Sequence, residues 1–270
     1  MCNAANGAGG EFNDEDVARC YAFRAPYPET LHERLAGLAA GRARLLDLGC
    51  GPGKLARALA GRFDAIDAVD RSHAMLAAGR ELDSGRHPHI NWIEARAEDI
   101  AFDGPYDLAV AGASIHWMRH DIVMPKLARA LRQGAPLALV DGDGPSQAPW
   151  MDAYQTEVIR WVERSGRRWQ DRAHRDLVTA HLPWIDIEGL ETFTITVRQK
   201  IEDLIEAEHS RATWARSRMG AETAEAFDAS LRAILEPAAI GEAVEYVARS
   251  TIVWGRPRLS PRPTASGSRG

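Results

Sequence analysis

The 270-residue sequence predicts an α/β fold, a doubly wound parallel sheet with helices on both of its faces. Between residues 43 and 141, short apolar runs alternate with segments in which apolar residues recur every three or four positions. This alternation is typical of right-handed βαβ units. The stretch LLDLGCGPGKLARALA, residues 45–60, also places three glycines at the first strand-to-helix junction, the edge where open α/β sheets bind ligands.

The strands and helices of this region follow one another in order. Apolar and β-branched residues predict strands at RLLDL (44–48), AIDAV (65–69), INWIE (90–94), YDLAVAGA (106–113) and APLALV (135–140). Helical spacing predicts helices at KLARALAG (54–61), SHAMLAAGREL (72–82) and DIVMPKLARALRQG (121–134). Ser72 is placed to cap the second of these helices through its hydroxyl.

Outside this region the alternation stops. A helix is expected in PETLHERLAGLAAG (28–41), helices over 150–182, a strand at ETFTITV (191–197), further helix to about 235, and a last strand at EYVARSTIVWG (245–255). We therefore expect a seven-stranded sheet and a chain divided into five segments. These are an N-terminal lid segment (1–40), the ligand-binding core (41–144), a helical insertion after strand 5 as a substrate cap (145–190), the end of the core with strands 6 and 7 and intervening helices (191–256), and a disordered tail (257–270).

Composition excludes several classes of protein. Hydrophobic residues make up 45% of the chain, and a net charge of −5 with interspersed signs indicates neither a nucleic-acid nor a membrane surface. Cys2, Cys20 and Cys50 form no CxxC pair, and no apolar run reaches the ~18 residues of a membrane span. We expect a cytoplasmic protein with a small-molecule substrate, no metal site, and an oligomeric state that the sequence leaves open.

The glycine-rich turn predicts a ligand that lies against the backbone. Gly49, Gly51 and Gly53 allow positive φ and close approach, and Asp70 ends the next strand, where it could accept hydrogen bonds from ribose hydroxyls. GPGKLA from Gly51 also matches a variant of the dinucleotide fingerprint, so a nicotinamide-dependent oxidoreductase is an alternative. We find no Tyr-Lys or comparable hydride-transfer pair to support it.

The wider motif is more specific. LLDLGCGPG resembles motif I of the class I S-adenosylmethionine (SAM)-dependent methyltransferases, in which an acid such as Asp47 precedes the first glycine. The resemblance continues over roughly residues 20–258. YAFRAPYP (21–28), AVDRSHAMLAAG (68–79), IEARAEDIAF (93–102), YDLAVAGASIHWM (106–118) and STIVWGRP (250–257) are similar to further segments of a small-molecule branch with a His-Trp pair after the fourth strand.

This resemblance implies a Rossmann-like methyltransferase sheet and a set of cofactor-binding residues. Tyr21 and Arg24 would approach the amino-acid end of SAM, Asp70 the ribose, Met75 the adenine face, and Ala97 with Glu98 the adenine edge. The full expected set is Tyr21, Arg24, Asp47, Gly49, Cys50, Gly51, Gly53, Asp70, Arg71, Met75, Ala97, Glu98 and Ala113. Arg96 departs from the family, because it stands where an aspartate commonly accepts from the adenine amino group and arginine cannot accept.

The implied function is methyl transfer from SAM to an oxygen or nitrogen of a small molecule, with S-adenosylhomocysteine (SAH) as the product. His116 is the candidate catalytic general base, with a pocket-shaping role as the alternative. His116, Trp117 and His209 are the candidate substrate residues. Because of Arg96, a SAM-binding protein without methyl transfer is a further alternative.

Overall fold

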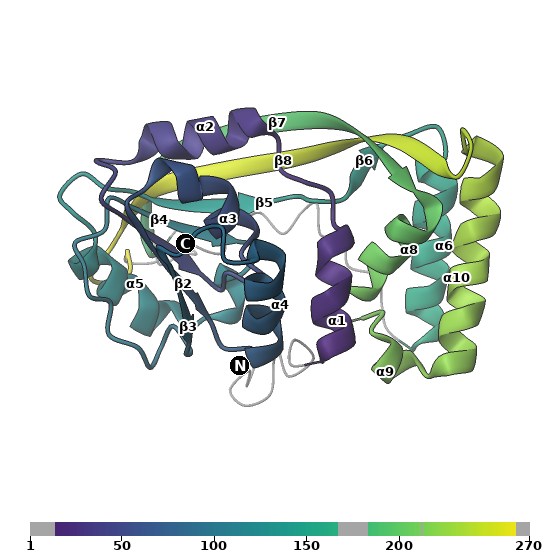
Figure 1. The fold of residues 1–270 in the computed structure, drawn as a ribbon, viewed down its shortest axis with the longest axis horizontal. Coiled ribbons are helices and arrows are strands. Elements are labelled where there is room, and N and C mark those ends of the chain that lie inside the picture. Colours follow the sequence, from purple (N-terminus) through teal and green to yellow (C-terminus); the bar gives the residue numbers. More distant parts are fainter. Residues whose placement is uncertain (1–13, 167–182, 212, 263–270) are drawn as a thin grey trace, which may run out of the picture.

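The computed structural model describes residues 14–166, 183–211 and 213–262. A sheet covered by helices forms one lobe, and a group of helices forms a second (Figure 1). Two long strands, β7 (Ile185–Lys200) and β8 (Ala243–Pro257), run from one lobe to the other.

The sheet has the order β3-β2-β1-β4-β5-β8, and its first five strands are parallel. These strands are β1 (Arg44–Leu48), β2 (Ala65–Asp70), β3 (Ile90–Glu94), β4 (Leu108–Gly112) and β5 (Leu137–Asp141). β8 is antiparallel to β5 along one edge and to β7 along its whole length on the other. The short β6 (Pro145–Gln147) pairs with residues 247–248 of β8, whereas β5 pairs with residues 251–255. β5 and β6 therefore lie one after the other along the same edge of β8. The α/β prediction is confirmed. Within the described residues the sheet has eight strands, because β6 adds one to the expected seven.

Both faces of the parallel sheet are buried, as a doubly wound fold requires. Leu45 and Leu108 belong to a core that includes residues of α2 (Glu29–Leu38) and α3 (Lys54–Leu59), and their neighbours Leu46 and Ala109 pack with residues of α5 (His120–Ala130). The alternation follows from the two-residue period of a strand. Helix α4 (His73–Asp83) begins as predicted, with the Ser72 hydroxyl accepting from the Met75 amide at 3.1 Å. The short 3-10 helices η3 (Ala60–Arg62) and η6 (Glu236–Ala238) extend α3 and α10.

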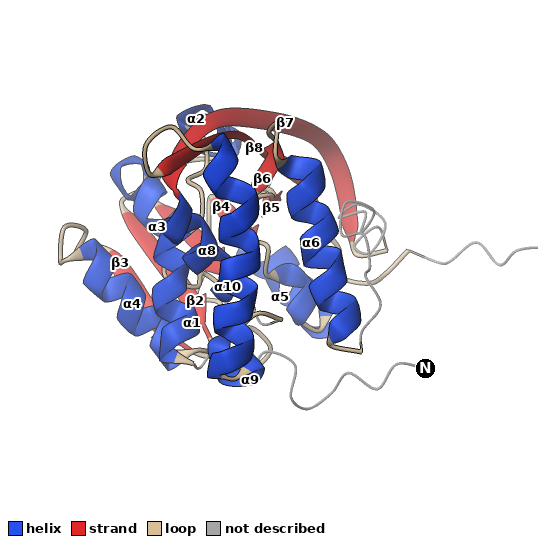
Figure 2. Ribbon diagram, turned by 90° about the vertical axis from the view of Figure 1, so that its right-hand side faces the viewer, coloured by secondary structure: helices blue, strands red, loops and turns tan. Residues whose placement is uncertain are grey.

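The helical lobe comprises α6 (Met151–Arg164), α8 (Ile201–His209), α9 (Arg216–Met219) and α10 (Ala221–Leu235). Figure 2 shows α6 and α10 side by side beneath the end of the β7–β8 pair that lies in the helical lobe. Trp161, Leu204, Phe227 and Tyr246 belong to the apolar core of this lobe. In the described part of the chain the segment after β5 supplies only β6 and α6, whereas α8, α9 and α10 lie between β7 and β8. The part of the expected helical stretch 150–182 that follows residue 166, and most of the tail, lie outside the described residues.

The N-terminal segment joins the two lobes. Helix α1 (Glu15–Cys20) is followed by the 3-10 helix η2 (Tyr21–Phe23) and leads to α2. Val17 and Ala18 of α1 pack with Met75 of α4 on one side and with Ala215 of the helical lobe on the other. Among the helices that the structure describes, none combines the length and apolar character needed to cross a bilayer.

Candidate functional site

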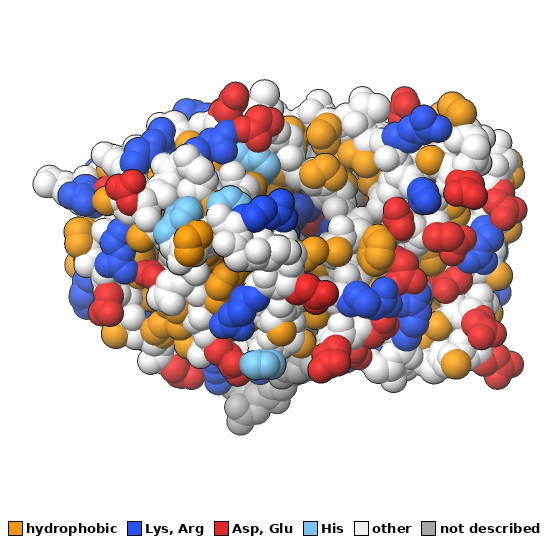
Figure 3. Space-filling view, viewed as in Figure 1, with side chains coloured by type: hydrophobic (Ala, Val, Ile, Leu, Met, Phe, Trp, Pro, Cys, Tyr) orange, Lys and Arg blue, Asp and Glu red, His pale blue; other side chains and the backbone are white. Residues whose placement is uncertain are grey.

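A pocket lies at the carboxyl ends of the parallel strands, between the two lobes. Its volume is about 1100 Å³, which includes its open mouth. Figure 3 shows the surface hollowed between the lobes, with Lys and Arg side chains beside the opening. Loops after all five parallel strands and the N-terminal segment contribute to its wall. All the predicted cofactor residues except Gly53 line it: Tyr21, Arg24, Asp47, Gly49, Cys50, Gly51, Asp70, Arg71, Met75, Ala97, Glu98 and Ala113.

The three glycines of the first loop have different physical reasons to be glycine. All three have positive φ, between +55° and +72°. A Cβ on Gly51 would meet nothing within 4 Å, so this residue leaves open space at the pocket wall. A Cβ on Gly49 would lie 2.5 Å from the Ser114 Cβ, and one on Gly53 would collide with the Trp92 ring. Gly49 and Gly51 both line the pocket, but only at Gly51 would a side chain project into open space, whereas packing requires glycine at positions 49 and 53.

Two aspartates at neighbouring strand ends have different partners. The carboxylate of Asp70 accepts from the Gly51 amide and from the Ser72 amide, each at 2.8 Å, so it is held beside the glycine loop. Burial raises the pKa of Asp70 from its ordinary value. Asp47 points toward α3 and accepts from the Ala56 amide at 3.0 Å. Burial raises the pKa of Asp47 to about 7.

A group of cations surrounds a third aspartate, Asp143, just beyond β5. The Asp143 carboxylate lies 3.2 Å from the Lys54 amine and 3.4 Å from the Arg24 guanidinium. Burial alone would raise the pKa of Asp143, but the charges of Arg24, Lys54 and Arg211 hold it well below its usual range. We call Arg24, Lys54, Arg211 and Asp143 the cation cluster.

Aromatic rings support two of these cations. The Arg24 guanidinium lies 3.9 Å from the centre of the Tyr21 ring, and the Lys54 amine lies 4.1 Å from the centre of the Tyr27 ring. Contacts of this kind stabilise a partly desolvated cation. Burial also lowers the pKa of Lys54.

Residues 21–28, which we call the N-terminal strap, are fixed by contacts to both lobes. The Gln199 amide donates to the Phe23 carbonyl at 2.6 Å, and Lys54 donates to the Ala25 carbonyl. Arg24 donates to the Ser210 hydroxyl at 2.7 Å and to the Ser210 carbonyl at 3.3 Å. The strap is thus attached to the glycine loop, to β7 and to the end of α8.

The opposite end of the pocket carries the segment after β3. Glu98 lines the pocket with a mostly buried side chain, and its carboxylate accepts from the Arg119 amide at 2.8 Å. Arg96 is half exposed, and its guanidinium lies 3.6 Å from the Glu98 carboxylate. Glu98 is therefore an acid with an oriented carboxylate at the position where the resemblance predicts the adenine edge.

The three predicted substrate residues are not brought together. Trp117 lines the pocket and is 48% exposed, and it belongs to the 3-10 helix η4 (Ile115–Trp117) after β4. His116, on the same turn, is exposed to solvent, lies outside the lining residues, and has its ring 4.9 Å from that of Trp117. His209 is fully buried in the helical lobe and also lies outside the pocket wall.

The polar residues of the pocket wall that were not predicted include Tyr27, Lys54, Ser114 and Asp143. Lys54 directly follows the glycines, and Asp143 follows the fifth strand, so both occupy strand-end positions where a ligand is expected. The described part of the chain contains no group of three or more His, Cys, Asp or Glu side chains that could hold a metal ion.

Comparison with known proteins agrees with this geometry. Residues 45–134 match the family model described as a methyltransferase domain. A trans-aconitate 2-methyltransferase from Paracidovorax citrulli is 37% identical over 143 residues, which is 45% of this chain and 52% of that protein. A protein of the same name from Streptomyces avermitilis is 29% identical over 238 residues, 79% of this chain and 83% of the relative. The match to the first of these relatives thus spans about half of its length.

The fold is also that of a solved protein. The structure of a presumed type II methyltransferase from Anaeromyxobacter dehalogenans superposes with a TM-score of 0.67 at 25% identity, over 88% of this chain and 99% of the other. Residues 45–134 are therefore a methyltransferase domain of the α/β Rossmann-like class.

Proposed function

We propose that the whole chain transfers a methyl group from SAM to an oxygen of a small molecule that carries several carboxylates. The observation that carries the proposal is the cation cluster, which places Arg24 and Lys54 in the wall of the pocket of a methyltransferase domain. The names of the relatives support it, because aconitate is a tricarboxylic acid.

The residues of the pocket fit the cofactor. The open space at Gly51 leaves room for the amino-acid end of SAM, and Asp70 keeps its carboxylate beside that glycine, where it would hold the ribose hydroxyls. Met75 would pack on the adenine, and Glu98 would accept from the adenine amino group in place of the missing aspartate. The N-terminal strap would act as a lid, with Tyr21 and Arg24 facing the cofactor carboxylate.

The charges around Arg24 support an anionic acceptor. Arg24, Lys54 and Arg211 carry three positive charges, and Asp143 and Glu208, whose carboxylate lies 3.2 Å from the Arg211 guanidinium, carry two negative ones. The other acids of the pocket wall, Asp47, Asp70 and Glu98, each accept from a backbone amide and belong to the expected cofactor set. SAM itself has one carboxylate against an ammonium and a sulfonium group, so an acceptor carboxylate beside Arg24 and Lys54 would offset the positive charge that this cluster retains.

A carboxylate acceptor also explains how little catalytic machinery the pocket holds. SAM supplies a methyl group that its sulfonium has already activated. An ionised carboxylate has no proton to lose, so no general base is needed, and rate is gained by holding the acceptor in line and excluding water. Trp117 and Met118 offer apolar surface in the pocket for that purpose.

Calorimetry with SAH, SAM and NAD, followed by mass spectrometry of incubations with SAM and a panel of mono-, di- and tricarboxylic acids, tests this function. We expect SAM and SAH to bind, NAD not to bind, and methyl esters to form on the acids with two or three carboxylates. Asp70→Ala should weaken SAH binding by roughly 2–4 kcal/mol, because hydrogen bonds to a charged acceptor are lost.

Three outcomes would contradict the proposal. Binding of NAD without any response to SAM would indicate the oxidoreductase alternative. SAM binding with no conversion of any acid would leave a SAM-binding protein. Equal turnover of uncharged alcohols or amines would refute the acidic acceptor.

A further inference from the structure

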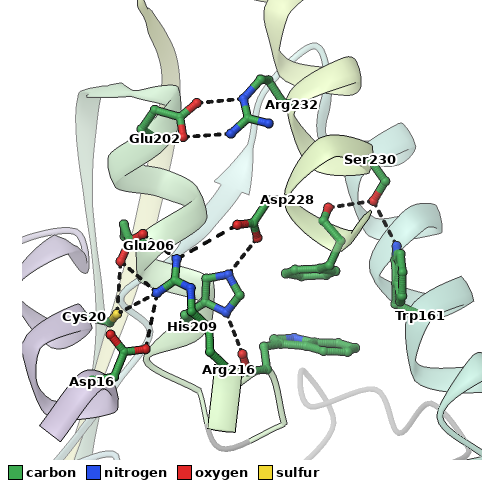
Figure 4. A network of polar contacts seen from close by, with 12 residues as sticks. Asp16, Cys20, Trp161, Glu202, Glu206, His209, Arg216, Asp228, Ser230 and Arg232 are labelled. Carbon is green, nitrogen blue, oxygen red and sulfur yellow. Dashed lines mark hydrogen bonds and ion pairs between the residues drawn. The ribbon is translucent and has the colours of Figure 1, made fainter. Parts of the chain in front are cut away.

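His209 is buried between two hydrogen-bond acceptors (Figure 4). Its Nδ1 lies 2.6 Å from the Trp214 carbonyl oxygen, and its Nε2 lies 2.7 Å from a carboxylate oxygen of Asp228 in α10. A carbonyl oxygen only accepts, so Nδ1 must carry a proton. At 2.7 Å a second proton must lie between Nε2 and Asp228, because two lone pairs would otherwise face each other. The His209–Asp228 pair therefore holds one proton more than a neutral imidazole beside a free carboxylate.

The charged groups around the pair come from α8 itself and from two further elements, α9 and α1. Arg216 of α9 lies 4.0 Å from the second oxygen of Asp228, which favours an ionised carboxylate. The same guanidinium pairs with Glu206 of α8 and, at 3.3 Å, with Asp16 of α1. The thiol of Cys20, at the end of α1, donates to Glu206 at 3.2 Å.

The histidine of the pair is shielded from solvent. His209 is fully buried, and Phe227 of α10 supplies an apolar ring 5.8 Å from the His209 ring. The Asp228 side chain is 20% exposed, so the shared proton lies between a buried ring and a carboxylate at the surface of the helical lobe.

The residue after His209 contacts a side chain of the pocket wall. Ser210 accepts from Arg24 through both its hydroxyl and its carbonyl, and its own hydroxyl donates to the Ala207 carbonyl. On the other side of Ser210, the His209 ring binds the Trp214 carbonyl. The residue that holds the Arg24 guanidinium thus directly follows the histidine of the protonated pair.

We infer that His209 is a positioning residue, and that the proton shared with Asp228 holds the end of α8 against Trp214 in the form that aims Arg24 into the pocket. This inference rests on the proposed function, because it takes Arg24 to bind the cofactor carboxylate. Without the shared proton, the buried Nε2 lone pair and the carboxylate would repel each other, the contact between His209 and Trp214 would loosen, and affinity for the cofactor would fall.

The test compares the pH dependence of SAH affinity, measured by calorimetry from about pH 5.5 to about pH 9, in the wild type and in Asp228→Asn. The asparagine amide can donate to Nε2 while Nδ1 still donates to Trp214, so the variant keeps both contacts without a titrating proton. Wild-type affinity should fall about tenfold over this range, a common size for coupling between two sites. In Asp228→Asn, SAH affinity should change with pH only because the ionisable groups of SAH itself titrate.

A matched control removes another ion pair between the same helices. Glu202 of α8 pairs with Arg232 of α10 at 2.8 Å, and Glu202→Gln should keep the wild-type pH profile. Nitrogen NMR should show two N–H groups on the His209 ring at the pH values where SAH binds tightly. The ring signals are assigned by their absence from the spectrum of His209→Gln. This measurement needs no folded Asp228 variant.

The outcomes separate the two claims. Equal pH profiles in the wild type and Asp228→Asn, or a single N–H on His209 where SAH binds tightly, would overturn the positioning role and leave the methyltransferase function intact. Absence of SAH binding at every pH would refute the proposed function, and the inference would fall with it.

Discussion

Asp47 and Asp70 end neighbouring strands, yet their surroundings give them different properties. Asp70 has two amide donors at the pocket edge, whereas Asp47 is fully buried and accepts from the Ala56 amide of α3. Asp47 therefore ties the first strand to the helix that follows the glycine loop, and desolvation raises its pKa to about 7. Asp47, which the family resemblance places at the cofactor, lines the pocket and also links these two elements.

The raised pKa of Asp47 makes stability depend on pH. Between the unfolded pKa near 4 and the folded value of about 7, the native state binds the extra proton, so the free energy of unfolding falls as the pH rises through this window. Asp47→Asn keeps an acceptor for the Ala56 amide and removes the titration. From about pH 5 to pH 8, denaturant unfolding should show the wild type losing about 2–3 kcal/mol relative to the variant. Parallel curves for the two proteins would show that Asp47 titrates at its ordinary value.

His116 offers a second test at the scale of one residue. If the acceptor is a carboxylate, no base is needed, and His116→Asn should retain most of the turnover rate with an unchanged pH profile. The exposed position of His116, outside the pocket wall, supports this expectation. A turnover rate lowered by roughly two to four orders of magnitude, with little change in SAM affinity, would instead identify a general base. Steady-state kinetics on the best acid of the panel distinguishes the two.

The sequence was informative where a residue acts within its own motif. Gly51 and Asp70 were predictable because a strand-end turn and the next strand end are adjacent in any parallel sheet. The cation cluster was not, because Arg24, Lys54, Asp143 and Arg211 come from four segments that meet only in the folded chain. His209 was assigned to the substrate from its polar helix, and only the structure shows both of its nitrogens occupied.

At the scale of elements, the alternating βαβ region was predicted well because each strand and helix has its own periodicity. β7 is longer than the predicted 191–197, since its first half, with a register shift between Ile187 and Gly189, lacks regular alternation in the sequence. β6 is three residues long, which is too short to show the alternation of apolar and polar residues by which a strand is predicted. The helical lobe combines pieces from both sides of β7, an arrangement that local spacing does not encode.

The N-terminal strap provides the prediction at this scale. Deletion of residues 1–28 removes the contacts of Phe23, Arg24 and Ala25 with Gln199, Ser210 and Lys54, so the sheet should stay folded while SAH affinity falls at least about tenfold. Deletion of residues 1–13, which precede α1, is the matched control and should bind as the full chain does. Calorimetry and circular dichroism measure the two effects. Full affinity without residues 1–28 would show that the strap is peripheral to the site.

At the scale of the whole molecule, the lobes are joined by a pair of strands. β7 and β8 are paired from Ile185–Pro257 at one end to Lys200–Ala243 at the other. β8 contributes Ile252 and Val253 to the cores of the sheet and Val244 and Tyr246 to the core of the helical lobe. The same strand therefore belongs to both lobes, and the pocket lies between them.

This shared strand has a mechanical consequence. To open the pocket by moving one lobe away from the other, the long antiparallel pair of β7 and β8 would have to bend and lose backbone hydrogen bonds. We therefore expect this pair to keep the distance between the lobes fixed. The strap, in contrast, crosses the same gap on a few hydrogen bonds and on the burial of Ala25 and Tyr27 in the cores of the two lobes. We therefore expect cofactor and product to enter and leave by movement of the strap and not by separation of the lobes, so that the rate of product release follows the strength of those contacts.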